Sequence, residues 1–445
     1  MGSVVLMKGM WQSWWTRLSV IAGFGLLVRL AFVLGITRFD EPVGDQLYYS
    51  AQALTNARGG WFEQPFSQGM PAADHPPLTS LLLTPVTWLT KSSGSFITAQ
   101  RLTMVVIGVA SIVVVAMIGR LLAGERVGLF AAVITAVYAN VWVNDGLVMA
   151  ETPAFFLLAI TMLMALIYRR QHHRKYLVGL GATSGLLALT RPELLLVTVL
   201  MVFFVIGVHR AEDVKRRLKS AAIVLIASLI VIAPWVIWNQ SRFSDSVYIS
   251  TNDGLTLAGA NCDSTYYNDI GSWDIWCAYE TSIPKDADAS QASTLMRHDG
   301  LSYWRGHITR YPVVAAARIA RVLSVGFIGS NSNAGASEGR PTWVSLLGVI
   351  QFWFIAVAAA IGWQNVSDRS ERWILLALLP VIVVVAMVAN AYVRFRLPAE
   401  VGLIVLAAIG INQVFNAKQK PKAFCASECW ALNDPYLVLV LNRAK

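Results

Sequence analysis

The chain has few charged residues and few cysteines for its length of 445 residues. Charged side chains make up only 14% of it, against about 25% in a typical soluble domain. Its four cysteines form neither a disulfide framework nor, together with histidine, the spacing of a structural zinc site. These shortages argue against an ordinary soluble domain, a disulfide-rich secreted fold and a zinc-binding module.

Hydrophobic residues, by contrast, make up 56% of the chain, and sixteen residues are tryptophan. Apolar runs near 20 residues recur, which is the length that a helix needs to cross about 30 Å of hydrocarbon. The net charge of +10 is better explained by a cytoplasmic excess of Lys and Arg than by nucleic-acid binding, because no basic stretch carries interleaved aromatics. We therefore predict an all-α polytopic membrane protein with membrane lipids, and not nucleic acid, as partners.

Ten segments are predicted to span the membrane, and two of them are short. They are 18–37, 97–119, 128–147, 149–168, 177–190, 192–208, 220–238, 343–363, 373–390 and 397–415. The first follows Lys8 and Arg17 and lacks a small-residue cleavage site, so it is expected to be a retained helix and not a signal peptide. The run 78–89 is too short to span and is predicted to be an interfacial or re-entrant helix. The fold is expected to contain about 10–12 transmembrane helices.

The connections between these spans differ sharply in charge on the two sides. With the N-terminus inside, "GRLLAGER", "RRQHHRKY", "DRSERW" and "NAKQKPK" all fall on one side, which the positive-inside rule makes cytoplasmic. Both termini, including the tail 416–445, are then cytoplasmic, and the protein is expected in the plasma (inner) membrane. A single transmembrane domain is predicted to cover 1–415.

The opposite, outer side receives two large connections, 38–77 and 239–342. Loops of this size are usually functional or small folded units. In the second loop, Arg318 and Arg321 lie three residues apart among apolar residues, which favours a helix in the membrane interface, with an eleventh crossing as the alternative. An oxidising outer compartment allows Cys262 and Cys277 to pair without establishing that they do.

Ionisable residues gather at the predicted outer ends of the helices. They are Asp45, Asp74, His75, Asp145, Glu151, Arg191, Glu193, Arg242, Arg394, Arg396 and Glu400. Individually, each has a structural explanation: an acid such as Asp45 can cap a helix, Glu193 can favour a helix dipole, and arginines can anchor an interface. Arg29 lies inside the first span, where a charge is normally paired inward, so a structural partner is expected for it.

Because these residues converge on one leaflet, a catalytic role is favoured over separate structural roles. Carboxylates can take a proton from an attacking hydroxyl, and arginines bind phosphate through permanently charged forks. A phosphate with an apolar tail at a membrane surface is a lipid phosphate. These residues therefore indicate transfer of a group from a lipid-linked phosphate to an acceptor on the outer side.

Several short motifs resemble, in order and in topological place, the GT-C superfamily of glycosyltransferases. They are "GDQLYYSAQAL", "ADHPPLTSLLL", "ERVGLFAAVITAVYANVWVNDGLVMAETPAFFLLA", "LTRPELLL" and "YVRFRLPAE". The resemblance covers about 17–411 and is closest to the protein mannosyltransferase-like and aminoarabinose transferase-like group, including actinobacterial members. It implies a membrane enzyme that takes a sugar from a polyprenyl-phosphate donor and passes it, with inversion, to a glycan, lipid or protein acceptor.

The resemblance also implies residue roles. Asp45 matches the acid of the first loop that acts as base or positions the acceptor, although the acidic pair frequent in that loop, here Asp40 and Glu41, lies upstream. Asp74 and His75 match a polar pair facing the donor. Glu151 matches the acid at the start of the fourth helix. The convergence of charges adds Arg191, Glu193, Arg394 and Arg396 to the predicted substrate-binding residues, with either Arg191 or Arg394 and Arg396 stabilising the leaving phosphate. No cofactor is assigned, and a divalent cation near Asp74, His75 and Glu151 stays open.

Two other classes of function fit part of the pattern. A lipid or solute transporter, or a flippase, would also place charges near one leaflet, but the halves lack the paired broken helices typical of secondary transporters. A non-catalytic scaffold would use the second loop to bind a partner and would tolerate loss of Asp45, Glu151 and Arg191.

Overall fold

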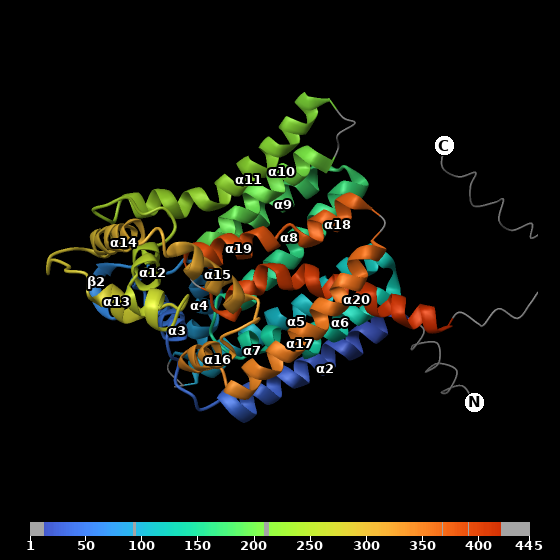
Figure 1. Ribbon diagram of the computed structural model, residues 1–445, viewed down its shortest axis with the longest axis horizontal. Coiled ribbons are helices and arrows are strands. Elements are labelled where there is room, and N and C mark those ends of the chain that lie inside the picture. Colours follow the sequence, from blue (N-terminus) through green and yellow to red (C-terminus); the bar gives the residue numbers. More distant parts are fainter. Residues whose placement is uncertain (1–12, 92–94, 209–212, 367, 390, 420–445) are drawn as a thin grey trace, which may run out of the picture.

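The computed structural model of the chain describes residues 13–91, 95–208, 213–366, 368–389 and 391–419 (Figure 1). This part is almost entirely helical, as the sequence predicts. Its long bundle consists of α2 (Trp14–Phe32, extended by a π-helical turn, Val33–Thr37), α5 (Phe96–Ala123), α6 (Glu125–Val137), α7 (Ala139–Asp145), α8 (Glu151–Gln171), α9 (Arg174–Ala188), α10 (Leu195–Val208), α11 (Val214–Gln240), α17 (Thr342–Asn365), α18 (Arg369–Leu376), α19 (Leu379–Val388) and α20 (Leu397–Gln419).

Every predicted span corresponds to a helix or a helix pair, and the all-α membrane fold is confirmed. By length and composition, seven helices in the described ranges can cross a membrane, or eight if α6 and α7, bent by 60°, count as one span. The number is below the predicted 10–12 because α9 and α10 have only 15 and 14 residues. At 1.5 Å per residue they are about 21–23 Å long. The predicted tail lies outside the described residues beyond Gln419.

Two helices occupy the centre of the bundle. In α8 and α20, 78% of the apolar window is buried, more than in the other candidate spans of the described chain. Both contribute to the largest apolar cluster, which also takes in residues of α5, α9 and α17. The two helices begin at the same end of the bundle: α8 opens on Glu151, and α20 follows the 3-10 turn Val393–Arg396. The most deeply buried helices therefore carry charged residues to one end.

The first large connection folds against that end. It contains α3 (Asp45–Ala57), a short antiparallel hairpin of β1 (Glu63–Gln64) and β2 (Ser67–Pro71), and then α4 (Leu78–Thr90). The 13-residue α4 corresponds to the short helix predicted over 78–89. The Arg242 guanidinium, just after α11, donates to the carbonyls of Phe62 and Ala72 at 2.9 and 3.2 Å. This ties the hairpin to the start of the second connection.

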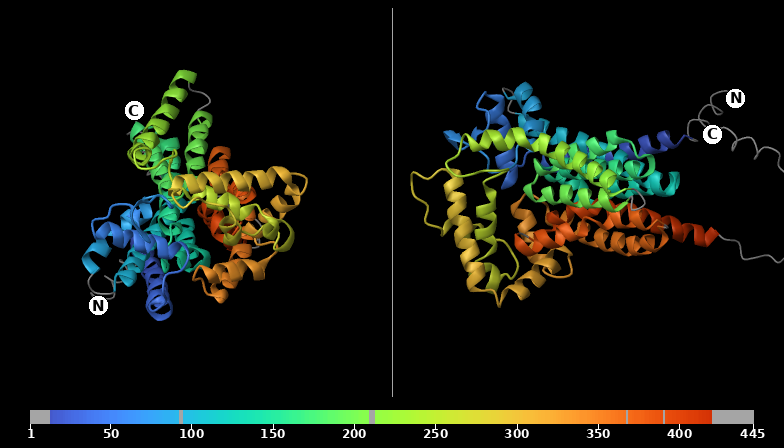
Figure 2. Two further views of the ribbon diagram at one scale, coloured as in Figure 1. Left: turned by 90° about the vertical axis from the view of Figure 1, so that its left-hand side faces the viewer. Right: turned by 90° about the horizontal axis from the view of Figure 1, so that it is seen from above.

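The second large connection forms a helical layer across the same end of the bundle (Figure 2). Its elements are α12 (Asn252–Ala260), a π-helical turn (Ser264–Asn268), α13 (Ile275–Tyr279), α14 (Ala289–Gly306), α15 (Tyr311–Val322) and α16 (Ile328–Ser337). The start of α2 and the end of α20 lie at the opposite end (Figure 1). Most of the second connection is therefore helical.

The helix α15 is not an eleventh crossing. It has 12 residues, about 18 Å, which is too short to span a membrane. Arg318 and Arg321 are fully buried: Arg318 donates to the carbonyls of Met387 and Ala260, and Arg321 pairs with Asp269. The arginine face of this helix is therefore used to hold the second connection onto the bundle.

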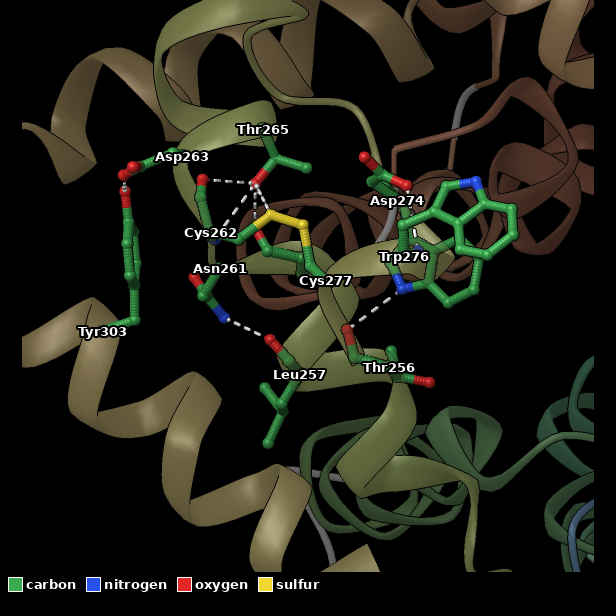
Figure 3. Close-up of a disulfide and its surroundings, with 12 residues drawn as sticks. Thr256, Leu257, Asn261, Cys262, Asp263, Thr265, Asp274, Trp276, Cys277 and Tyr303 are labelled. Atoms are coloured by element: carbon green, nitrogen blue, oxygen red, sulfur yellow. Dashed lines mark hydrogen bonds between the residues drawn. A yellow bond between two sulfur atoms is a disulfide. The ribbon is translucent and has the colours of Figure 1, made fainter. Parts of the chain in front are cut away.

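A disulfide braces the same layer (Figure 3). Cys262 and Cys277, left open by the sequence, are bonded, with their Cα atoms 6.1 Å apart and 15 residues of separation. Next to it, Thr265 Oγ1 donates to the carbonyl of Ala260 at 2.8 Å. The disulfide encloses the loop between α12 and α13 and limits its conformations.

The buried charge in the first span has the inward partner expected of it. Arg29 is fully buried and its Nε lies 2.7 Å from Asp145 Oδ2. Asp145 also accepts a hydrogen bond from Thr152 at 2.8 Å, and Arg29 donates to the carbonyl of Ala136 at 3.2 Å. The pair joins α2 to the end of α7.

Changing Arg29 to Met is expected to destabilise the protein by about 3–5 kcal/mol, because it leaves the Asp145 carboxylate buried without its charge partner. Thermal unfolding of the protein in detergent measures the loss. The double change Arg29→Met with Asp145→Leu should recover part of the stability, since no unpaired charge remains. A double variant that is less stable than both single variants would contradict this account of the pair.

Candidate active site

Asp45 opens α3 and points away from its own helix. The N-cap of α3 is Gly44, whose φ of 56° is a left-handed value that favours glycine, so Asp45 is the first residue of the helix and not its cap. Instead, Asp45 Oδ2 lies 2.7 Å from Nη1 of Arg394, and Oδ1 lies 3.6 Å from Nε2 of His75. The capping explanation for Asp45 is thereby set aside.

Arg394 is the hub of the charges at this end of the bundle. Its guanidinium lies 2.7 Å from Asp45, 2.9 Å from Glu338 and 3.4 Å from Glu151, and its side chain is 10% exposed. These three carboxylates come from the first connection, the second connection and the start of α8. A single arginine therefore joins segments almost three hundred residues apart.

Arg191 forms a second arm of the same network. Its Nη1 lies 2.5 Å from Glu151 Oε1 and its Nε lies 2.5 Å from Glu193 Oε1. The guanidinium also stacks over the ring of Phe395, 4.5 Å from its centroid. Glu151, which is almost fully buried, thus accepts from both Arg191 and Arg394.

His75 joins the network from the segment before α4. The amide of Leu78 donates to the carbonyl of Leu189 at 2.9 Å, which brings this segment beside the end of α9. The His75 ring packs against both Tyr48 and Tyr49, with its centroid 4.8 Å from the centroid of each. Its half-buried neighbour Asp74 accepts from Gln64 Nε2 at 2.5 Å and interacts with Tyr48. Asp74 therefore lies beside the network and not within it.

Arg396 lies apart from its neighbour Arg394. It is fully buried and bonds to Glu400 at 2.7 Å and to the carbonyl of Val322 at 2.9 Å. Its guanidinium also stacks on Phe352 at 3.5 Å. Of the residues predicted to bind substrate, the structure places Arg396 in the packed core, where it holds α15 against α20.

The network includes two residues that the sequence analysis missed. Glu338 and Arg340 flank Gly339, whose φ of 82° requires glycine and beside which an added Cβ would lie 2.7 Å from Gln46 Nε2. Arg340 donates to Asn144 Oδ1, and the carbonyl of Glu338 accepts from Gln46 at 2.7 Å. The available signal was "SEGRPTW", a charged stretch directly before an apolar run. We call the whole set the charged cluster: Asp45, His75, Glu151, Arg191, Glu193, Glu338, Arg340 and Arg394.

Burial and the neighbouring charges shift the pKa values of these groups in different directions. Burial by itself raises the pKa of Asp45, but the Arg394 guanidinium and His75 outweigh it and hold that pKa well below its ordinary value of 3.8. Burial raises the pKa of Glu338 despite Arg394 and Arg340. Burial lowers the pKa of Arg191, but Glu193 and Glu151 more than restore it, so it lies above its ordinary value. Two carboxyls on one guanidinium thus differ in proton affinity.

The same side chains do not assemble a metal site. Among the described residues, no group of three or more His, Cys, Asp or Glu side chains is arranged to hold a metal ion. Of the three residues considered for a cation, Asp74 faces Gln64, His75 faces Asp45, and Glu151 faces the two arginines. In this arrangement the positive charge that an anion would meet comes from guanidinium groups.

Comparisons with known proteins agree with this architecture. A family profile described as dolichyl-phosphate-mannose-protein mannosyltransferase matches residues 74–238, a segment that runs from Asp74 through α11. None of the curated proteins matches the chain.

Solved structures that match the chain include the following three. Archaeal oligosaccharyltransferase AglB from Archaeoglobus fulgidus, in complex with an inhibitory peptide and a dolichol-phosphate, has a TM-score of 0.54 at 13% identity, over 94% of this chain and 53% of that one. The oligosaccharyltransferase of the same organism, tethered with an acceptor peptide, has a TM-score of 0.55 at 15% identity. The match covers 92% of this chain and 50% of that one. ArnT from Cupriavidus metallidurans bound to undecaprenyl phosphate has a TM-score of 0.46 at 14% identity. The match covers 90% of this chain and 78% of that one.

The chain spans about half the length of the oligosaccharyltransferases that it matches. Their TM-scores show that the chain shares the fold of these oligosaccharyltransferases. The fold indicated by the sequence motifs is confirmed, and the protein is a multi-pass membrane protein.

Proposed function

We propose that the protein is a membrane glycosyltransferase that moves a sugar from a polyprenyl-phosphate carrier to a hydroxyl acceptor, with the charged cluster as its active site. The observation that carries the proposal is the pair of buried guanidiniums, Arg394 and Arg191, that share Glu151 while Arg394 also holds Asp45. Guanidinium forks suit a phosphate, and a carboxylate beside them suits the proton of an attacking hydroxyl.

The depth of the cluster favours a lipid carrier over a free sugar nucleotide. The cluster lies where α8 and α20 begin, at one end of helices long enough to span a membrane. The basic residues Arg169 and Arg170 close α8 at the other end, where α2 also begins (Figure 1). Under the positive-inside rule that end is cytoplasmic, which puts the proposed site on the outer face of the plasma membrane.

Donor binding would exchange one set of ion pairs for another. The cluster already balances its guanidiniums with carboxylates, so a phosphate that reaches Arg394 takes the place of Asp45. The displaced carboxylate loses the partner that lowers its pKa and becomes a better base for the acceptor hydroxyl. Phosphate binding and base activation are coupled through one guanidinium.

The proposed reaction is a single displacement. The acceptor oxygen bonds to the anomeric carbon from the face opposite the phosphate, its proton passes to Asp45, and the bond between the anomeric carbon and the phosphate oxygen breaks. The polyprenyl phosphate leaves with the bonding electron pair, and Arg394 and Arg191 stabilise its added negative charge. The anomeric configuration is inverted. The acceptor is a hydroxyl of a glycan, lipid or protein of the cell envelope.

Reconstitution tests the proposal. The purified protein in liposomes is supplied with radiolabelled polyprenyl-phosphate hexoses and pentoses, and with envelope material from a strain that lacks the gene. The label is expected to leave the lipid and enter a product with inverted configuration, and mass spectrometry of surface glycans should show the same structure missing from the deletion strain. Movement of the labelled lipid across the bilayer without any transfer would identify a flippase instead.

A further inference from the structure

A second hollow lies outside the charged cluster, in the helical layer of the second connection. It has a volume of about 420 Å³, within the roughly 300–1,000 Å³ of small-molecule sites. One wall is the loop between α12 and α13, with Asp269, Trp273 and Asp274, and the other is α16, with Asn333. Tyr392 lies between them. We call this hollow the outer cleft.

The lining of the outer cleft suits a ligand rich in hydroxyl groups. Trp273 and Tyr392 offer aromatic surface for the C–H face of a sugar ring, while the carboxylates and the Asn333 amide accept or donate hydrogen bonds. Serine hydroxyls complete the lining at Ser264, Ser272 and Ser330. An acyl chain would leave these polar groups without partners, which is costly.

The balance of charge favours a neutral ligand. Asp269 is paired with the buried Arg321 and accepts a hydrogen bond from Ser330 Oγ at 2.7 Å. Asp274 uses Oδ1 to accept from the amide of Trp276 at 3.0 Å, at the start of α13 (Figure 3). The carboxylates are thus held in place, and one of the two is already neutralised. A positively charged peptide would therefore meet less negative charge than the two carboxylates of the lining would carry if both were unpaired.

The cleft is held in shape before any ligand arrives. Five of its nine lining residues lie between the bonded cysteines Cys262 and Cys277. The Tyr392 hydroxyl donates to the carbonyl of Trp273 at 3.0 Å, and the Trp273 indole donates to the carbonyl of Thr256 at 3.2 Å. A preformed site loses less conformational entropy when a ligand binds.

The outer cleft adjoins the proposed active site at one shared lining residue, Tyr392. Tyr392 also lines a smaller hollow of about 30 Å³, whose other walls include Glu338, Arg340 and Arg394. A carbohydrate bound in the cleft beside Tyr392 would therefore lie next to the hollow that Arg394, the partner of Asp45, also lines.

We infer that the outer cleft binds a neutral oligosaccharide, and that this carbohydrate is the acceptor of the transfer reaction. The binding site stands on the geometry of the cleft, whereas the role as acceptor rests on the proposed function. A protein or lipid acceptor would then be recognised through its glycan.

The test is saturation-transfer NMR of the full-length protein in nanodiscs, with maltotriose, mannotriose and arabinotriose as probes. At least one trisaccharide is expected to receive saturation from the wild-type protein. Asn333→Trp, which fills the cleft from α16, is expected to weaken that binding on the order of tenfold. The matched control is Ala336→Trp, because Ala336 is exposed on the same helix and lines neither hollow.

The possible outcomes distinguish carbohydrate binding in the outer cleft from the transfer reaction. Asp45→Asn should keep trisaccharide binding while losing transfer, whereas Asn333→Trp should raise the KM for acceptor and leave the affinity for polyprenyl phosphate unchanged. Binding without transfer by the wild-type protein would overturn the proposed function and the acceptor role, and would retain the carbohydrate site. No binding of any of the three trisaccharides, or equal loss in the Ala336→Trp control, would overturn the inference. A thermal melt confirms that each variant is folded.

Discussion

Replacing Asp45 with Asn is expected to lower the rate of sugar transfer by a factor on the order of 10²–10⁴, the usual contribution of a positioned base. Asn keeps the size of the side chain and can still accept a hydrogen bond from Arg394, but it cannot take the proton of the acceptor hydroxyl. The measurement is kcat/KM for transfer from a radiolabelled polyprenyl-phosphate sugar. The affinity for polyprenyl phosphate should not fall, because the carboxylate competes with that phosphate for Arg394.

Asp40→Asn is the matched control, since Asp40 is an exposed acid of the same connection, five residues upstream. It is expected to leave transfer unchanged. The low pKa of Asp45 in the free protein predicts that the carboxyl stays ionised as the pH falls to its ordinary value of 3.8, so protonation of Asp45 should reduce kcat/KM only below that point. Transfer that survives Asp45→Asn, or that is lost equally in Asp40→Asn, would remove Asp45 from the mechanism.

Replacing Arg394 with Gln is expected to have the second largest effect. The change removes one partner from each of Asp45, Glu338 and Glu151, and it removes positive charge from the proposed phosphate site. Loss of one charge-stabilising donor costs roughly 10²–10³ in rate. Arg394→Lys should recover little, because an ammonium group is a point charge and cannot reproduce the planar fork that three carboxylates share.

Arg396→Gln is the control for Arg394, only two residues along the chain. Arg396 bonds to Glu400 and the core, so this variant should unfold at a lower temperature while its folded fraction keeps the wild-type KM for the donor. Arg394→Gln should instead raise that KM and lower kcat. If both variants changed only the unfolding temperature, Arg394 would be a structural residue, and the proposed phosphate site would be lost with it.

The membrane fold could be predicted almost completely from the sequence. Long apolar runs must be helical in lipid, because no water is present to satisfy the backbone, and each of the ten predicted spans is a helix or helix pair. The same rule explains the Arg29 prediction, since a charge inside a span needs a partner. It does not fix helix length to the residue, and α9 and α10 are shorter than typical spans.

The site was only partly predictable. Asp45, Glu151, Arg191 and Arg394 could be proposed because polar residues at one end of a bundle must share one leaflet. Which of them pair with one another could not be predicted. Arg394 binds carboxylates from three segments, and no local sequence pattern connects these segments. Arg394 and Arg396 illustrate the limit: they are two residues apart on a 3-10 turn, yet one lies in the charged cluster and the other in the core.

Apolar run length and the asymmetry of basic residues, which are properties of the chain alone, were enough to specify a multi-pass helical protein with its ionisable residues gathered at one end. The contact of Glu338 and Arg340 with that end, the burial of Arg318 and Arg321, and the outer cleft required the folded chain. The reason is physical: local sequence controls whether a segment can lie in lipid, whereas charge pairing depends on which distant segments the packed helices bring within 3–4 Å.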